Sequence, residues 1–321
     1  MASLKELSKR QELLSPGHRA CVGCGAAIAI RQVMLAAQKV PVVASCATGC
    51  LEIFTSIYPF SAWRIPWFHN AFENSAATAS GMEAAYRALK RTGKFTKDVR
   101  FIAFGGDGGT YDIGLQSLSG AMERGHRMLY VCYNNDAYMN TGIQRSSSTP
   151  RGMHTTTSPA GTVIPGKQQN RKDLTEIMVA HNLPYVAQTE PAHWQDLNNK
   201  VEKALDTDGP TFINVYAPCQ LGWGYPPEDT MPLLRLAVET CFWPVYEVVD
   251  GKYKVNIKPK DKKPVVEFLK PQARFRHLFA PKNEHIIAEF QAEIDRRWES
   301  LLAKEALSQA GPESMKILIA K

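Results

Sequence analysis

Two apolar runs, each ending in residue types that bind metals, place the strongest constraint on the fold of this chain. Residues 101–104 end in Gly-Gly-Asp-Gly-Gly, and residues 128–133 end at Asn134-Asn135. Apolar runs of this length are typical of buried parallel strands. The segment between them has apolar residues at helical spacing: Leu115, Leu118, Ala121 and Met122. An acidic side chain and an amide therefore follow neighbouring strands at their carboxyl ends, where open α/β sheets bind ligands.

The alternation of strand-like and helix-like segments continues along the chain. We expect strands over 41–44, 185–189 and 211–216, and helices over 26–37, 74–90, 171–183 and 194–205. Residues 54–70 have no clear period and predict a loop. Residues 141–170 are dense in Ser, Thr and Gly, and a loop this long inside a domain is usually functional or disordered. The pattern predicts an α/β fold with a mostly parallel sheet flanked by helices.

The residues at the two strand ends also suggest a ligand. Asp107 and Asn135 carry oxygens suited to Mg²⁺, which usually completes its coordination with substrate phosphates. The sequence Gly-Asp-Gly at 106–108, followed by 25 residues and then Asn-Asn, resembles the binding motif for thiamine diphosphate (TPP). A glycine turn alone is common, but the spaced amides and the Tyr-Met-Asn-Thr-Gly sequence favour the cofactor.

The wider sequence resembles one family. Residues 106–125 and 138–150 are similar to the TPP-binding β subunit of pyruvate:ferredoxin oxidoreductase (pyruvate synthase), in the 2-oxoacid:ferredoxin oxidoreductase family. The resemblance runs from about residue 18 to about residue 246 and leaves the last 75 of the 321 residues uncovered. It implies a TPP-binding fold of the diphosphate type, with a C-terminal extension.

The resemblance implies roles for residues at both strand ends. It implies three Mg²⁺ ligands: the side chains of Asp107 and Asn135 and the carbonyl oxygen of Ala137. It implies that the TPP diphosphate is surrounded by the backbone of three glycines: Gly106, Gly108 and Gly109. Asn140 matches the family's asparagine near the reacting centre, and Thr141 lies beside it. A turn-forming role before Thr-Gly is the alternative for Asn140.

The cysteines suggest a second metal site. Cys21 and Cys24 are spaced so that both thiolates can reach one metal, and Cys50 and Cys219 follow predicted strands. The pair alone is compatible with zinc, a redox dithiol or no function. Redox-active pairs of the thioredoxin type come just after a strand, at the start of a helix. This pair follows a polar leader segment instead, so a redox role is disfavoured. Four cysteines hold either zinc or an iron–sulfur cluster, and the residues alone leave that choice open.

The resemblance favours iron and sulfur. The sequences around Cys21, Cys24, Cys50 and Cys219 are similar to the family segments that carry four cluster ligands, and they imply one [4Fe–4S] cluster. Cys46 lies four residues before Cys50, where the family usually has another residue, so we expect it not to bind the cluster. We expect the other two cysteines to be buried apolar side chains: Cys132 and Cys241.

TPP also needs a carboxylate that activates its aminopyrimidine ring. Glu73 and Glu83 lie in the helix expected over 74–90 or just before it, where solvated or packing roles are ordinary. In the family, this glutamate comes from a different subunit. The resemblance therefore implies that this chain holds half of an active site. It implies an α subunit with the pyrimidine half-site, further γ- and δ-type subunits, ferredoxin, coenzyme A (CoA) and a 2-oxoacid substrate.

Charge and length divide the chain into two parts. Residues 251–321 contain 15 Lys and Arg against 9 Asp and Glu, which accounts for six of the net seven positive charges. These basic residues do not form a stripe with aromatic residues, so we expect contact with partner subunits rather than with nucleic acid. We expect a TPP- and iron–sulfur-binding α/β domain over 1–245 and a C-terminal extension over 246–321, with a hairpin at 246–255 and a charged helix at 285–302.

No signal-peptide-like start or membrane-length apolar run occurs, so cytoplasm is the default location and no membrane contact is expected. The predicted function is a β subunit that oxidises pyruvate with CoA and ferredoxin, reversibly, to acetyl-CoA and CO₂. Two alternatives stay open. One is the same chemistry on another 2-oxoacid, such as oxalate, phenylglyoxylate or a branched-chain acid. The other is a non-catalytic subunit stabilised by zinc.

Overall fold

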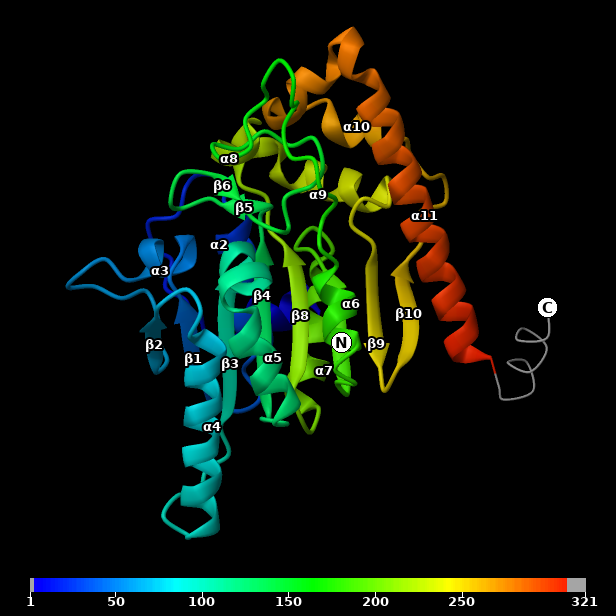
Figure 1. Ribbon diagram of the computed structural model, residues 1–321. Helices are drawn as coiled ribbons and strands as arrows, with labels where there is room; N and C mark the ends of the chain where they lie inside the picture. The colour runs from blue at the N-terminus through cyan, green and yellow to red at the C-terminus, as the bar shows by residue number, and fades with distance from the viewer. Residues whose placement is uncertain (1–2, 311–321) are drawn as a thin grey trace.

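The computed structural model describes residues 3–310, so the last residues of the predicted extension, 311–321, lie outside the described part. The chain forms one eight-stranded sheet in the order β10-β9-β7-β8-β4-β3-β1-β2 (Figure 1). The strands from β7 to β2 in this order pair in parallel, and β9 pairs antiparallel with both β7 and β10. The predicted α/β fold with a mostly parallel sheet is confirmed.

The main sheet has these strands: β1 Val42–Ala47, β2 Trp67–Asn70, β3 Arg100–Gly106, β4 Met128–Asn134, β7 Tyr185–Thr189, β8 Thr211–Tyr216, β9 Val245–Val249 and β10 Lys252–Ile257. A small antiparallel ribbon joins β5 Ala137–Tyr138 to β6 Gln144–Arg145. The α-helices are α1 Leu4–Leu7, α2 Gly25–Ala36, α3 Cys50–Thr55, α4 Ser75–Arg91, α5 Leu115–Glu123, α6 Leu174–Val179, α7 Trp194–Asp206, α8 Gln220–Trp223, α9 Thr230–Glu239, α10 Val265–Leu269 and α11 Glu284–Gln309. A π-helical segment, Gly108–Ile113, leads into α5, and shorter 3₁₀ turns lie at Pro227–Asp229, Ala273–Phe279 and Pro281–Asn283.

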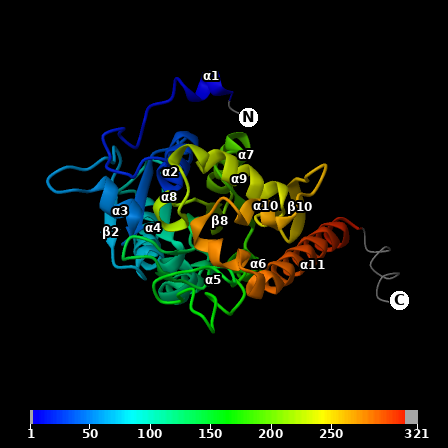
Figure 2. The same cartoon turned by 90° about the horizontal axis from the view of Figure 1, so that it is seen from above.

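Helices cover both faces of the sheet because its central strands are apolar on both sides. In Figure 2, α2 and α7 lie on one side of β8, and α5 and α6 lie on the other. Helix α4 packs against β1 and β3 on the same face as α5. Every residue of β4 and β8 is buried, as expected for strands covered on both faces. The central strands are therefore held rigidly, and so are the loops at their carboxyl ends.

A third core lies beyond the tip of β8, among α8, α9, α10 and the first half of α11 (Figure 1). Its aromatic side chains come from distant parts of the chain: Trp223, Phe242, Phe268, Phe275 and Phe290. The hairpin predicted over 246–255 is present as β9 and β10, which extend the main sheet beside β7. The expected boundary between residues 245 and 246 therefore falls inside β9.

Three local predictions were wrong. Residues 54–70 contain the end of α3 and the edge strand β2, which pairs with β1. Helix α6 is shorter than predicted because the Asp173 carboxylate caps its start by accepting from the backbone N–H of Glu176 (3.3 Å). Helix α11 is longer than predicted. No helix within residues 3–310 is both long enough and apolar enough to cross a membrane.

Candidate active site

Four adjacent strands deliver the predicted site residues to one edge of the sheet. The order β8-β4-β3-β1 and the register, with Gly106 opposite Tyr133 and Asn134 opposite Tyr216, align the carboxyl ends of these strands. The chain leaves β3 at Asp107 and leaves β4 at Asn135. It reaches Cys50 three residues after β1, and Cys219 three residues after β8. This is the edge at which open α/β sheets bind ligands.

A small pocket at this edge contains every residue predicted for the TPP site. Its lining comprises the predicted residues Gly106, Asp107, Gly108, Gly109, Asn135, Ala137, Asn140 and Thr141, together with Thr48, Gly49, Cys50, Phe72, Tyr133, Tyr138 and Met139. The pocket volume is about 20 Å³. One water molecule needs about 10–15 Å³, so this pocket holds a small ion or one end of a larger ligand, not a whole coenzyme.

An amide and two oxygen atoms converge in the pocket. One end of the Asn135 side-chain amide lies 2.9 Å from the carbonyl oxygen of Ala137 and 2.9 Å from Oδ1 of Asp107. In the metal-free chain the amide NH₂ at this end donates to both oxygens. With the amide turned over, its oxygen would join the other two as a third acceptor. Adjacent ligands of an octahedral Mg²⁺ with bonds of 2.0–2.1 Å are about 2.9 Å apart. The donor set and its spacing therefore fit Mg²⁺.

The Asp107 carboxylate is buried and has few donors. It accepts from the backbone N–H of Asn135 (3.2 Å) and closely from the hydroxyl of Ser146. Burial raises the pKa of Asp107 to about 7, because the ionised form has lost its water without gaining a cationic partner. A bound cation would restore the ionised form, which is a second reason why this pocket fits Mg²⁺.

The glycines of the pocket are required by packing within the chain as well as by any ligand. A Cβ on Gly108 would lie 2.3 Å from the ring of Tyr138, whose hydroxyl donates to the Gly108 carbonyl (2.9 Å). A Cβ on Gly109 would lie 3.0 Å from the carbonyl oxygen of Phe72. The Gly-Asp-Gly turn is therefore enclosed by Phe72 and Tyr138, and only glycine leaves backbone exposed beside the metal ligands.

The mouth of the pocket is open to solvent. Asn140 and Thr141 are both exposed there, and the Thr141 hydroxyl donates to the side chain of Gln144 (2.5 Å). No glutamate among residues 3–310 lines the pocket. Glu83 is buried elsewhere, against His126 (2.8 Å) and Arg87 (3.0 Å), and Glu73 does not reach the pocket. The partner's activating carboxylate stays a prediction, since neither glutamate considered from the sequence lines this pocket.

The turn with Cys21 and Cys24 packs against the segment that carries Cys219. The backbone N–H of Gly25 donates to the Pro218 carbonyl (2.9 Å), and a Cβ on Gly25 would lie 2.5 Å from the Pro218 nitrogen. On the other side, Thr230 donates to the Gly23 carbonyl (2.8 Å). These contacts bring together two segments almost 200 residues apart in sequence.

The predicted cluster thiols affect one another electrostatically. Burial and, to a smaller extent, the nearby thiols of Cys219 and Cys21 raise the pKa of Cys24 to about 11. Burial and, to a smaller extent, Cys219, Cys24 and Cys21 raise the pKa of Cys50 to about 12. Thiols in this environment stay protonated unless a metal ion replaces the protons. Four clustered cysteine sulfurs are the donor set of an iron–sulfur or zinc site.

The four thiols nevertheless do not form a preformed metal site. No group of three or more His, Cys, Asp or Glu side chains in the described chain is arranged to hold a metal ion as it stands. Cys46 faces the sheet core beside Trp67, and no other cysteine affects its pKa. Cys132 and Cys241 are buried, as expected. The four-cysteine assignment therefore remains a prediction, and the position of Cys46 agrees with its exclusion.

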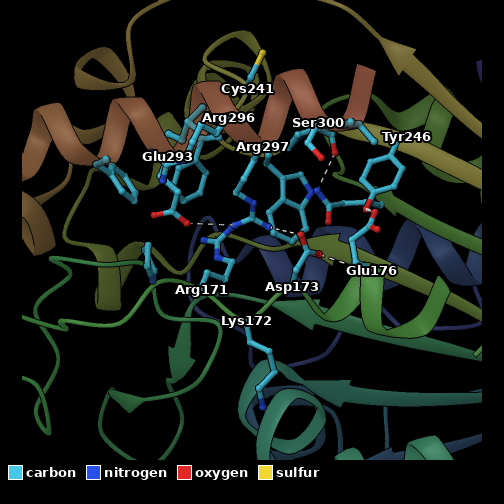
Figure 3. A pocket seen from close by; sticks show the side chains of 18 of the residues that line it. Arg171, Lys172, Asp173, Glu176, Cys241, Tyr246, Glu293, Arg296, Arg297 and Ser300 are labelled. Carbon is cyan, nitrogen blue, oxygen red and sulfur yellow. Dashed lines mark hydrogen bonds and ion pairs between the residues drawn. The ribbon is translucent and has the colours of Figure 1, made fainter. Parts of the chain in front are cut away.

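A second, larger cavity lies between α11 and the segment that enters α6. Its volume is about 210 Å³, and it contains none of the predicted site residues. Figure 3 shows Glu293 and Arg297 on α11 at one wall of this cavity, and Arg171, Asp173 and Glu176 on α6 and the segment that enters it at the other. Most of these charges are paired, for example Arg297 with Asp173 (2.6 Å). Arg171, which lines this cavity, also contacts Asp136 (2.7 Å), next to the predicted site.

Sequence reasoning missed three residues around the pocket. Ser146 donates to Asp107, although it appears in the sequence only as part of a Ser-rich loop. Tyr133 places a buried hydroxyl in the pocket without a hydrogen-bond partner among the described residues. Asp136 lies between two predicted Mg²⁺ ligands and is fully buried. In the sequence, its position next to Asn135 was the one feature that could have pointed to a role for Asp136 at the site.

Comparison with known proteins agrees with this geometry. Residues 44–215 match the family model described as thiamine pyrophosphate enzyme, C-terminal TPP binding domain. The chain is 52% identical over 314 residues to pyruvate synthase subunit PorB of Thermotoga maritima, covering 96% of this chain and 97% of the relative. It is 54% identical over 294 residues to PorB of Methanocaldococcus jannaschii, covering 91% and 97%.

One solved structure is similar in fold. A 2-oxoglutarate:ferredoxin oxidoreductase from Magnetococcus marinus superimposes with a TM-score of 0.52 and 21% identity, over 64% of this chain and 66% of that chain. At this identity the similarity supports the fold alone.

Proposed function

This chain belongs to the pyruvate synthase PorB family and to the thiamine pyrophosphate enzymes, and from this we propose that it is the TPP-binding β subunit of a 2-oxoacid:ferredoxin oxidoreductase that acts on pyruvate. The reaction converts pyruvate, CoA and oxidised ferredoxin to acetyl-CoA, CO₂ and reduced ferredoxin, reversibly. The observation that carries the proposal is the pocket in which the Asp107 carboxylate, the Asn135 amide and the Ala137 carbonyl meet, with Cys50 in the same wall.

Within this proposal, the chain's own residues bind and orient the cofactor. Asp107, Asn135 and the Ala137 carbonyl would hold Mg²⁺, and the backbone of Gly106, Gly108 and Gly109, which lines the pocket, would surround the diphosphate. Bound TPP supplies a nucleophilic carbon and an electron sink for the decarboxylation of a 2-oxoacid. Phe72 and Tyr138 hold the turn in place, so that little rearrangement is needed when the diphosphate binds.

Asn140 and Thr141 are the proposed catalytic residues because they lie at the open mouth of the pocket. The amide of Asn140 can donate to an oxygen that gains charge during the reaction, which is the common way in which such donors act. Asn140 also interacts with Cys50 and lowers its pKa, although burial outweighs this effect. One residue therefore borders both the cofactor pocket and the cysteine site.

We further propose that Cys21, Cys24, Cys50 and Cys219 hold one [4Fe–4S] cluster. Such a cluster accepts one electron at a time and passes it to ferredoxin. Cys50 lines the cofactor pocket, so a cluster bound there would lie next to the site where the electrons are released. Zinc would bind the same four thiols, but it has no redox chemistry and would not accept electrons from the reaction.

The proposed partners follow from what the pocket lacks. An α subunit would cover the exposed mouth and supply the activating glutamate, and γ- and δ-type subunits and ferredoxin would be further partners. CoA would enter at the shared site. The segment 246–321 is proposed to contact these partners through its described surface. All seven cysteines are free thiols, which suits the proposed cytoplasmic location.

The purified complex tests this proposal directly. We expect pyruvate- and CoA-dependent reduction of ferredoxin or a viologen dye, with TPP and Mg²⁺ required. We also expect a broad visible absorption band, with iron and sulfide in a cluster ratio. Zinc without that band would contradict the cluster, and a higher rate with another 2-oxoacid in a substrate panel would contradict pyruvate.

A further inference from the structure

Asp136 lies between the two proposed Mg²⁺ ligands Asn135 and Ala137 and is completely buried. Its backbone φ is +71°, in the left-handed region that residues other than glycine seldom adopt. Such a conformation persists only where the surroundings hold it. The Asp136 N–H donates to the side-chain oxygen of Asn134 (3.0 Å), and its carbonyl accepts from the Thr149 hydroxyl (2.6 Å).

The Asp136 carboxylate is held by three side chains from distant parts of the chain. It accepts from Arg171 (2.7 Å), from Arg274 (2.8 Å) and from the Tyr216 hydroxyl (2.5 Å). Hydrogen bonds between ionised groups are strong and directional. Every polar atom of Asp136 therefore has a partner, and the backbone on both sides of it is fixed.

Arg274 contacts the same loop by a second route. Its guanidinium stacks on the ring of Trp223, 3.7 Å from the ring centroid, and the Trp223 indole N–H donates to the Asn135 carbonyl (2.8 Å). The side chain of Gln272 fixes the other edge of the guanidinium (2.8 Å). Arg274 belongs to the 3₁₀ turn Ala273–Phe279, and only 3% of its surface is exposed.

We propose that Arg274, acting through Asp136 and Trp223, is a positioning residue that holds Asn135 and Ala137 in the geometry that binds Mg²⁺. The proposal rests on the proposed function, because it assumes that this loop binds the metal. It gives the C-terminal segment a role within the cofactor site, in addition to any contact with partners. Arg171 borders a cavity, whereas Arg274 also contacts Trp223, which binds the Asn135 carbonyl, so Arg274 is the member of the network to test.

A merely structural ion pair would behave differently. Removing one partner of a buried pair destabilises the fold whatever the site does, so loss of stability or of activity cannot distinguish the two roles. The Mg²⁺ concentration needed for TPP binding does distinguish them, because a structural role changes the melting temperature and leaves this midpoint where it was.

The test compares three substitutions with a matched control, each in the full chain within its native complex. Arg274→Met keeps the bulk of the side chain and removes its charge. Arg274→Lys keeps the charge but loses the planar guanidinium, whose several N–H donors reach more than one partner. Tyr216→Phe removes one hydrogen bond to Asp136. The control is Arg276→Met, an exposed arginine in the same turn. TPP binding is followed by calorimetry over a series of Mg²⁺ concentrations.

Loss of a residue that orients a metal ligand typically weakens metal affinity about 10–100-fold, and we expect a shift of that size in the Mg²⁺ midpoint for Arg274→Met. Arg274→Lys and Tyr216→Phe should shift it less, in the same direction. Saturating Mg²⁺ should restore TPP binding and the maximal rate. Arg276→Met should match the unmodified protein, and the visible cluster spectrum should be the same in all four.

An unchanged midpoint in folded Arg274→Met would overturn the proposal. If Arg274→Met does not fold, Tyr216→Phe decides, and an unchanged midpoint there would overturn it equally. Failure of the proposed function gives a different result, since the unmodified complex would then show no Mg²⁺-dependent TPP binding at all.

Discussion

At the scale of single residues, the amide of Asn135 links the metal-free site to the metal-bound one. One end of this amide lies 2.9 Å from Oδ1 of Asp107 and 2.9 Å from the Ala137 carbonyl oxygen. In the metal-free protein the NH₂ group donates to both oxygens, and we expect the amide to turn its oxygen toward a bound Mg²⁺. The choice between the two orientations is thus linked to metal binding.

Asp107→Ala should abolish Mg²⁺-dependent TPP binding and leave the visible cluster spectrum intact. Asp107 is the only acidic side chain that lines the described pocket, so no other charge there can hold the metal. Calorimetry of TPP binding with and without Mg²⁺ measures the effect. Asp98→Ala, at an exposed ion pair with Lys90, is the control and should bind TPP normally. Unchanged TPP affinity in Asp107→Ala would show that the metal site lies elsewhere.

The cysteines at the end of β1 allow a second prediction at this scale. Cys50→Ser should lose or severely degrade the cluster, because its thiol lies near the other three. Cys46→Ser should retain the cluster but melt at a lower temperature, since a buried hydroxyl costs about 1–3 kcal/mol. Iron and sulfide analysis of the two variants measures the difference. Cluster loss in Cys46→Ser alone would reverse the assignment.

At the scale of elements, the site depends on how α2 meets the end of β8. Gly25 begins α2, and its backbone contacts Pro218 directly, next to Cys219. Cys24 and Cys219 therefore approach each other only as closely as this helix and strand allow. The close approach requires a residue without a side chain at position 25.

Gly25→Ala should separate Cys24 from Cys219, because the added methyl group would lie 2.5 Å from the Pro218 nitrogen. Overpacking of this kind typically costs about 1–3 kcal/mol. We expect a lower iron content with TPP binding retained. Gly81→Ala is the matched control, because nothing lies within 4 Å of its added methyl group, and within a helix it should stabilise by about 0.5–1 kcal/mol. Equal iron contents in the two variants would contradict the predicted contact between α2 and the cysteine site.

At the scale of the whole molecule, residues around the predicted site are exposed to solvent. Asn140 and Thr141 are exposed, and the pocket is far too small for a whole coenzyme. Val22 and Leu221, beside the predicted cluster cysteines, are 76% and 66% exposed. Apolar side chains gathered at a functional edge often mark a surface where another protein binds.

The chain alone should therefore fail to turn over pyruvate. Without a glutamate in the pocket, the aminopyrimidine would lack its activating group, and acid–base catalysis of this type is worth about 10²–10⁴-fold in rate. Viologen reduction with TPP, Mg²⁺, CoA and pyruvate measures activity, and added partner subunits should restore it. Iron analysis of the same sample verifies that the chain alone carries its cluster. A full rate from the single chain would mean that the activating carboxylate lies within it.

Local sequence patterns were sufficient to predict the central sheet and the position of the site. The apolar runs that became β3, β4 and β8 are covered on both faces, so their pattern does not depend on which neighbour covers them. The residues of the predicted cofactor site lie within 36 positions of one another, from Gly106 to Thr141, on two strands that pair directly. Because the site residues are close in sequence and lie on directly paired strands, their spacing alone was enough to predict that they lie together.

The remaining features depend on contacts between segments that the sequence keeps apart. β2 has only four residues, and its pairing with β1 makes it a strand, since its own pattern is that of a loop. Arg274 reaches Asp136 across 138 positions, and nothing local to either residue indicates that contact. By itself the sequence determined the central strands, the motif and the edge of the sheet where they meet. Only the tertiary structure decided which distant side chains hold the metal loop, because a buried charge is stabilised by whichever partner the fold brings to it.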